Sequence, residues 1–147
     1  MVKLAEDFKL QGVFSARVYK NGVLAEEIVE KNLIVNGAKD QVARLIAGDT
    51  EGRSIDRIAF GTGGAEPDAA DAEIENQYAR PVNGFSYPAM GQVQIDWSLP
   101  ISECNGMAIM EFGLLTADGT LFARRTRANP IHKESDISIE GSWTIIL

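Results

Sequence analysis

The sequence predicts a mainly β protein, an antiparallel β-sandwich of about seven strands with one amphipathic helix and a short second helix. Apolar and polar residues alternate with period two over several segments, which is the pattern of a half-buried strand. Asn-Gly and Asp-Gly pairs stand between such segments and favour tight hairpin turns. One segment, about 36–47, has helical spacing instead. The length of 147 residues predicts a single sandwich domain over 1–147.

The first predicted element is a β-hairpin over residues 8–31. Its first strand alternates from Phe8 to Val18, and Asn21-Gly22 supplies the turn. The return strand begins at Val23 and continues toward Val35. Charged residues on one face of this strand indicate that the face is exposed to solvent. We therefore expect the hairpin to project as an arm that pairs with a neighbouring subunit. A hairpin fully paired within its own domain is the alternative.

The helix over 36–47 has Asn36 as its expected N-cap. Its apolar face consists of Ala38, Val42, Leu45 and Ile46. A strand over 55–60 follows and ends in Gly61-Thr62-Gly63-Gly64. This glycine segment lacks the lysine of a phosphate-binding loop, so we interpret it as a structural turn. Residues 67–75 predict the short second helix, and residues 76–90 are irregular.

Four further strands complete the seven. They cover Gln92–Leu99, Met107–Leu115, Leu121–Thr126 and Ile137–Leu147. Asn105-Gly106 and Asp118-Gly119 mark turns between them. Trp97 and Trp143 fall on the apolar phase of their strands, which places both in the core rather than on a sugar-binding surface.

Charge and composition exclude several classes of function. The net charge of −7 disfavours binding to nucleic acid or to an anionic membrane surface. One cysteine and one histidine, Cys104 and His132, exclude an internal disulfide and a multi-histidine metal site. We expect no membrane insertion, because no signal peptide or apolar segment of about 20 residues is present. We also expect no cofactor, because the glycine segment lacks the nucleotide-binding patterns.

The residues also offer no catalytic constellation, so we do not expect an enzyme. A Cys104–His132 thiol pair is a minor alternative. Glu111 lies in an apolar strand, where a carboxylate either points outward or is buried with a partner. We expect a structural ion pair with an arginine, for instance Arg80 or Arg124.

Two segments of opposite charge complete the candidate residues. The acidic segment over 65–76 contains Glu66, Asp68, Asp71, Glu73 and Glu75, and the basic segment over 124–133 contains Arg124, Arg125, Arg127 and Lys133. Either both are solvated surfaces, or they meet across a subunit interface, where complementary charge steers assembly.

The order of motifs from residue 55 onward resembles a known family. The motifs are Ile58-Ala59-Phe60-Gly61-Thr62-Gly63-Gly64, Asn105-Gly106, Glu111-Phe112-Gly113-Leu114-Leu115, Asp118-Gly119-Thr120-Leu121 and a terminal strand. This order resembles the N-terminal domain of phage tail-collar fibre proteins and related small tail-fibre or baseplate proteins of tailed bacteriophages. The likeness covers residues 55–147.

The resemblance implies a structural virion protein without enzymatic activity. Such a collar, baseplate or fibre-attachment subunit would be made in the host cytoplasm, self-assemble and bind other tail proteins in the virion. A small receptor- or glycan-binding module is the alternative, as is a capsid or neck decoration protein.

Overall fold

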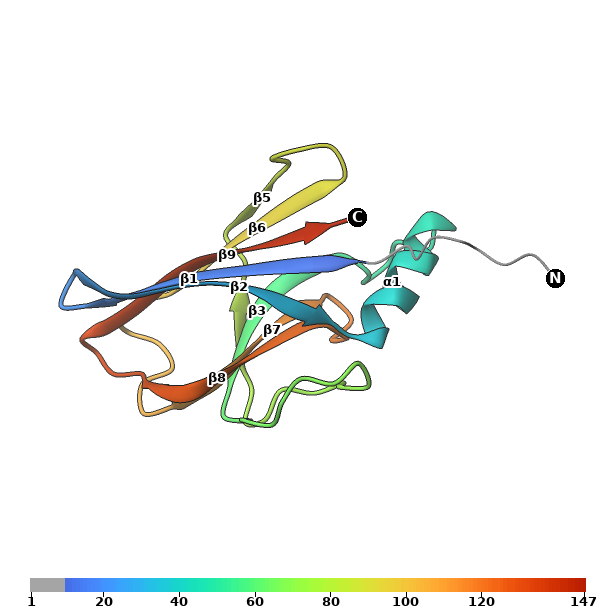
Figure 1. The fold of residues 1–147 in the computed structure, drawn as a ribbon. Coiled ribbons are helices and arrows are strands. Elements are labelled where there is room, and N and C mark those ends of the chain that lie inside the picture. Colours follow the sequence, from blue (N-terminus) through green and yellow to red (C-terminus); the bar gives the residue numbers. More distant parts are fainter. Residues whose placement is uncertain (1–9) are drawn as a thin grey trace.

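The computed structural model describes residues 10–147 as one antiparallel sheet of nine strands with one α-helix (Figure 1). The elements are β1 (Gln11–Lys20), β2 (Val23–Ile34), α1 (Asn36–Ile46), β3 (Ile55–Gly61), β4 (Tyr78–Pro81), β5 (Gly84–Ser86), β6 (Gln92–Leu99), β7 (Ala108–Thr116), β8 (Leu121–His132) and β9 (Ile137–Ile146). Phe8 and Lys9 of the predicted hairpin lie outside the described residues.

The strands form a half-barrel rather than a seven-stranded sandwich. Their spatial order is β4-β3-β7-β8-β2-β1-β9-β6-β5. All seven predicted strands form, and the short strands β4 and β5 add two in the segment predicted to be irregular. The sheet is continuous because the end of β2 pairs with β8 through Leu33 and Ile34. The two outermost strands, β4 and β5, are consecutive in the chain.

Aromatic side chains from both halves of the sheet meet in the core. Phe14 of β1 lies 4.7 Å from Phe112 of β7 and 4.9 Å from Trp143 of β9, measured between ring centroids. Phe60 of β3 meets Trp97 of β6 at 5.7 Å. Both tryptophans are buried, as their strand phase predicts. Packing between these rings thus holds β3 and β7 against β1, β6 and β9.

The predicted hairpin is confirmed, but only one of its two outer strand edges lacks a pairing partner over most of its length. Asn21 and Gly22 both have positive φ angles, 52° and 77°, as a type I′ turn requires. Strand β1 pairs with β2 on one edge and with β9 on the other. The outer edge of β2, in contrast, pairs with β8 only at Leu33 and Ile34. The hairpin is therefore part of the sheet, and one strand edge over residues 23–32 stays open.

Helix α1 confirms the predicted helix with two corrections. Its N-cap residue is Val35 and no side chain caps it; the N–H of Asn36 instead donates to the carbonyl of Ala69. The buried helix residues are Ala38 and Gln41, not the whole predicted apolar face. Ile46 is 83% exposed, because the helix covers one end of the half-barrel with only part of its surface.

The predicted second helix over residues 67–75 is wrong, since this segment contains turns and no helix. The Asp68 carboxylate accepts a hydrogen bond from the N–H of Ala70, and the Asp71 carboxylate accepts one from the N–H of Asp68. Such local side-chain bonds to the backbone compete with helix formation. A segment this short gains too little from helix propagation to overcome them.

Candidate functional site

Glu111 is a buried carboxylate, as expected, and it binds the glycine turn. It lies on β7 and is 1% exposed. Its Oε2 accepts hydrogen bonds from the N–H groups of Gly63 and Glu75. A Cβ atom on Gly63 would clash with that oxygen, so only glycine allows this approach. The N–H of Gly63 thus binds the protein's own carboxylate and that of Thr62 donates to the carbonyl of Glu75, which supports a structural role for the turn.

Arg124 on β8 is the arginine partner of Glu111. Its Nε donates to Glu111 Oε1 at 3.1 Å, and a terminal nitrogen donates to Asp71 Oδ2 at 2.9 Å. Another terminal nitrogen reaches the carbonyl of Gly63. The other arginine considered, Arg80, contacts the Ser98 carbonyl and Glu103 instead.

The acidic and basic segments therefore meet within one chain, through Arg124 and Asp71. Arg124 is 5% exposed, which removes it from any surface that a second subunit could contact. The other acidic residues of the segment, Glu66, Asp68, Glu73 and Glu75, are exposed.

The remaining basic residues also have partners in their own chain. Arg127 forms an ion pair with Glu26 at 3.0 Å, and Arg125 pairs with Glu30. These pairs lie where β2 and β8 separate, and they bridge a polar cleft of about 270 Å³ between the two strands. Side-chain ion pairs thus connect β2 and β8 over a stretch where their backbones are not paired.

Lys133, directly after β8, is fully buried. Its Nζ donates to Asn105 Oδ1 at 2.7 Å and to the carbonyl of Glu134 at 3.0 Å. Burial lowers the pKa of this amine. Lys133 thus holds the β6–β7 connection in place and is not an exposed interface residue.

Cys104 and His132 lie in different surroundings. Cys104 Sγ lies 3.6 Å from Met107 Sδ, and burial raises the pKa of the thiol. His132 is exposed on β8, and within residues 10–147 no hydrogen bond joins the two.

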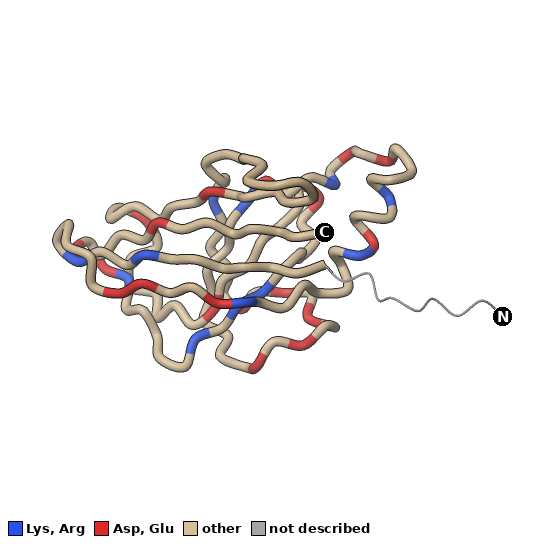
Figure 2. Tube along the Cα trace, turned by 45° about the horizontal axis from the view of Figure 1, so that its top comes forward, with Lys and Arg blue, Asp and Glu red and all other residues tan. Residues whose placement is uncertain are grey.

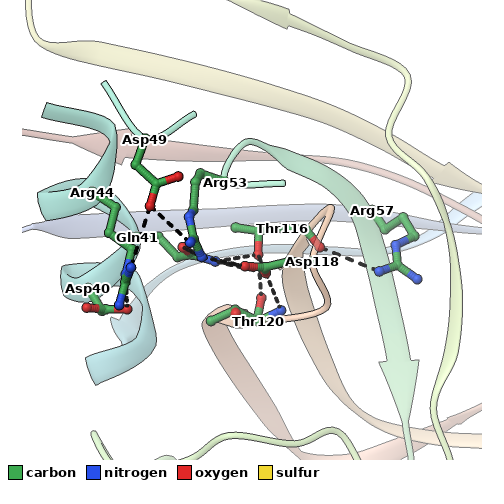
Figure 3. Close-up of polar contacts among 9 residues, drawn as sticks. All are labelled: Asp40, Gln41, Arg44, Asp49, Arg53, Arg57, Thr116, Asp118 and Thr120. Carbon is green, nitrogen blue, oxygen red and sulfur yellow. Dashed lines mark hydrogen bonds and ion pairs between the residues drawn. The ribbon is translucent and has the colours of Figure 1, made fainter. Parts of the chain in front are cut away.

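A polar network attaches α1 to the β7–β8 turn (Figure 3). The Asp118 carboxylate accepts hydrogen bonds from Thr116 Oγ1 at 2.6 Å and from Gln41 Nε2 at 2.9 Å. Arg53 pairs with the same carboxylate at 2.8 Å and with Asp49 at 3.2 Å. The hydrogen bonds from Thr116 and Gln41 hold the pKa of Asp118 well below its usual range. This network fixes the helix at the open end of the half-barrel.

A large hollow lies at that open end, between α1 and the β5–β6 hairpin. Its volume is about 660 Å³. Buried residues of three strands, Phe122, Ile95 and Ile145, line its inner part. Five exposed apolar side chains form its rim: Leu45, Phe85, Tyr87, Met90 and Leu147. We call this hollow and its rim the apolar mouth.

The two segments that contribute most to the rim contain no charged side chain. Arg53, which also lines the hollow, is paired with Asp49 and Asp118. Residues 81–95 and 141–147 contain no Asp, Glu, Lys, Arg or His, although charged residues make up 24% of the chain. Figure 2 shows both segments without red or blue stretches. Sequence reasoning did not single out this surface, and the uncharged run with Phe85, Tyr87 and Met90 was the signal that could have found it.

Comparison of the chain with protein-family models, with curated proteins and with solved structures finds no match. Within the described residues, no helix is long and apolar enough to cross a membrane. Residues 10–147 also contain no group of three or more His, Cys, Asp or Glu side chains that could hold a metal ion.

Proposed function

We propose that this chain is a non-catalytic structural subunit of a tailed bacteriophage virion. In this proposal it is a collar, baseplate or fibre-attachment protein of the tail, made in the host cytoplasm. It contacts copies of itself and other tail proteins. The order of its motifs supports the virion assignment, through the resemblance to tail-collar fibre proteins.

The apolar mouth is the observation that carries the assembly function. Large exposed apolar surfaces on small proteins mark sites of interaction rather than random exposure. The chain places Phe85, Tyr87 and Met90 together on such a surface. The buried charged groups Glu111, Arg124 and Lys133, in contrast, are held by partners in their own chain. These buried charges are therefore not available to a partner, whereas the apolar mouth is.

The test is to look for the chain in tailed particles released by the organism that encodes it. Purified particles are probed with an antibody against the chain, and gold labelling locates it by electron microscopy. We expect the label on the tail, at a constant number of copies per particle by quantitative mass spectrometry. A chain that remains in the soluble cell fraction and is absent from particles would overturn the proposal.

A glycan-binding module is the second candidate, and one observation favours it. Phe85 and Tyr87 are exposed aromatic side chains on the same rim, and aromatic rings of this kind can stack on sugar faces. A glycan array of the purified chain separates the two functions. Retention of a defined sugar, lost in a Tyr87→Ala variant, would favour the glycan-binding module.

A further inference from the structure

We propose that the apolar mouth is the surface through which two copies of this chain bind each other, each inserting Met90 into the hollow of the other. The inference rests on the proposed self-assembling function and adds the surface that performs it. It follows from the size, the charge and the shape of the mouth.

The size of the rim suits a protein partner. Met90 is fully exposed, Tyr87 is 80% exposed and Leu147 is 58% exposed. Aromatic side chains alone contribute roughly 150–250 Å² each when buried. The five exposed rim side chains therefore supply roughly a few hundred Å² of apolar surface, part of the ~800 Å² that each partner buries in a standard interface. An apolar surface of this size is comparable with the largest patch of a typical monomer, roughly 300–600 Å², and such patches are often functional.

The composition of the rim matches the centre of a protein interface. Interface cores are depleted of charge and enriched in aromatic residues and methionine. Residues 81–95 show both properties, since they lack charge and contain Phe85, Tyr87 and Met90. Methionine also adapts its flexible side chain to an irregular hollow.

Symmetry selects a second copy as the occupant. In a twofold interface residue i of one copy contacts residue j of the other, and residues near the twofold axis meet their own copies, so charges near the axis face like charges. The open edge of β2 is a weaker candidate, because Glu26 and Glu30 along it are already paired with Arg127 and Arg125 of their own chain. The uncharged residues 81–95 meet no such repulsion.

The shape of the mouth is also self-complementary. Met90 projects from the β5–β6 connection, and it borders a hollow of about 660 Å³. A projection beside a hollow permits reciprocal insertion when two copies face each other. Phe122 and Ile145, which line the hollow from within, would then be covered by the partner's methionine.

The experiment compares two double variants of the full chain by light scattering over a concentration series. We expect the wild-type mass to approach twice the 16.0 kDa of one chain. Tyr87→Glu/Met90→Glu should raise the dissociation constant about 30-fold or more, the effect of losing an interface hot spot. Val23→Glu/Val29→Glu is the matched control, since it adds the same charge at residues that are 68% and 63% exposed on β2. It should keep the wild-type mass. Circular dichroism confirms that both variants are folded.

Two results would overturn the inference. One is an assembly that Tyr87→Glu/Met90→Glu leaves unchanged. The other is a monomeric wild-type chain that binds anilinonaphthalene sulfonate through Tyr87 and Met90, which would make the mouth a site for small apolar ligands. The particle test separates this inference from the proposed function. A chain present in tails but assembled through another surface defeats only the inference, whereas a mouth-dependent dimer absent from all tailed particles defeats only the function.

Discussion

At the scale of single residues, the buried carboxylate of Glu111 has a role distinct from that of the many surface charges. It binds two backbone N–H groups and Arg124 while almost fully excluded from water. Breaking such a pair leaves an uncompensated charge in the interior, which destabilises proteins by about 3–5 kcal/mol.

We therefore expect Glu111→Ala to lower the free energy of unfolding by about 3–5 kcal/mol in urea titrations. Glu140→Ala is the matched control, because Glu140 forms an exposed pair with Arg17 at 3.7 Å. Exposed pairs contribute about 0–1 kcal/mol. Equal effects of the two substitutions would show that the Glu111 network does not stabilise the fold.

Asp118 predicts a dependence of stability on pH. Its pKa in the folded chain is depressed, chiefly by the hydrogen bond from Thr116 and next by that from Gln41. The unfolded carboxyl titrates at about 3.9, so its stabilising effect is complete above that pH and is lost as the pH falls toward the folded pKa. The stability difference between wild type and Asp118→Asn should therefore shrink when urea unfolding is moved from pH 6 to pH 3. A difference that is the same at both pH values contradicts this account.

At the scale of elements, the β1–β2 turn depends on a backbone conformation that favours glycine. Gly22 has φ +77°, and no atom lies within 4 Å of the point that a Cβ would occupy there. The left-handed conformation costs other residues roughly 1–2 kcal/mol. Gly22→Ala should thus lower the thermal midpoint, although it creates no clash.

Gly84→Ala is the control for this substitution. Gly84 on β5 also has open space around it but no positive φ, so alanine there should be neutral or slightly stabilising. If both variants melt at the same temperature, the turn does not need the conformation that Gly22 adopts.

The open edge of β2 makes a second prediction at this scale. Strand β1 is paired on both sides, whereas β2 lacks a partner on its outer edge over residues 23–32. Hydrogen exchange followed by NMR should therefore show slow exchange throughout β1. Outward-facing amides of β2 should exchange faster, because local backbone exposure limits protection. Uniform protection of β2 in the assembled protein would instead support the arm that pairs with a neighbour.

At the scale of the whole molecule, the sequence predicted the strands better than their arrangement. Strong alternation located the strand over Gln92–Leu99 at its observed bounds. It could not reveal β4 and β5, which span only 4 and 3 residues among Pro and Gly. It also could not reveal that all nine strands form one sheet, because only two residue pairs join β2 to β8.

The candidate site shows the same division between local and long-range information. The pairing of Glu111 with an arginine could be predicted, because a carboxylate in an apolar strand needs a partner. That Arg124 and Asp71 join within one chain could not, because these residues are brought together by the sheet order. The apolar mouth was missed because exposure of Phe85, Tyr87 and Met90 depends on how the β5–β6 hairpin stands away from α1 (Figure 1).

The central claim, that this half-barrel is a structural subunit of a phage tail, is tested most directly by a cryo-electron microscopy map of the intact particle. The account predicts density that fits the nine-stranded half-barrel in the collar, baseplate or fibre attachment of the tail. It also predicts copies in contact with one another there. A map in which every tail density is explained by other proteins, with no position for this chain, would contradict it.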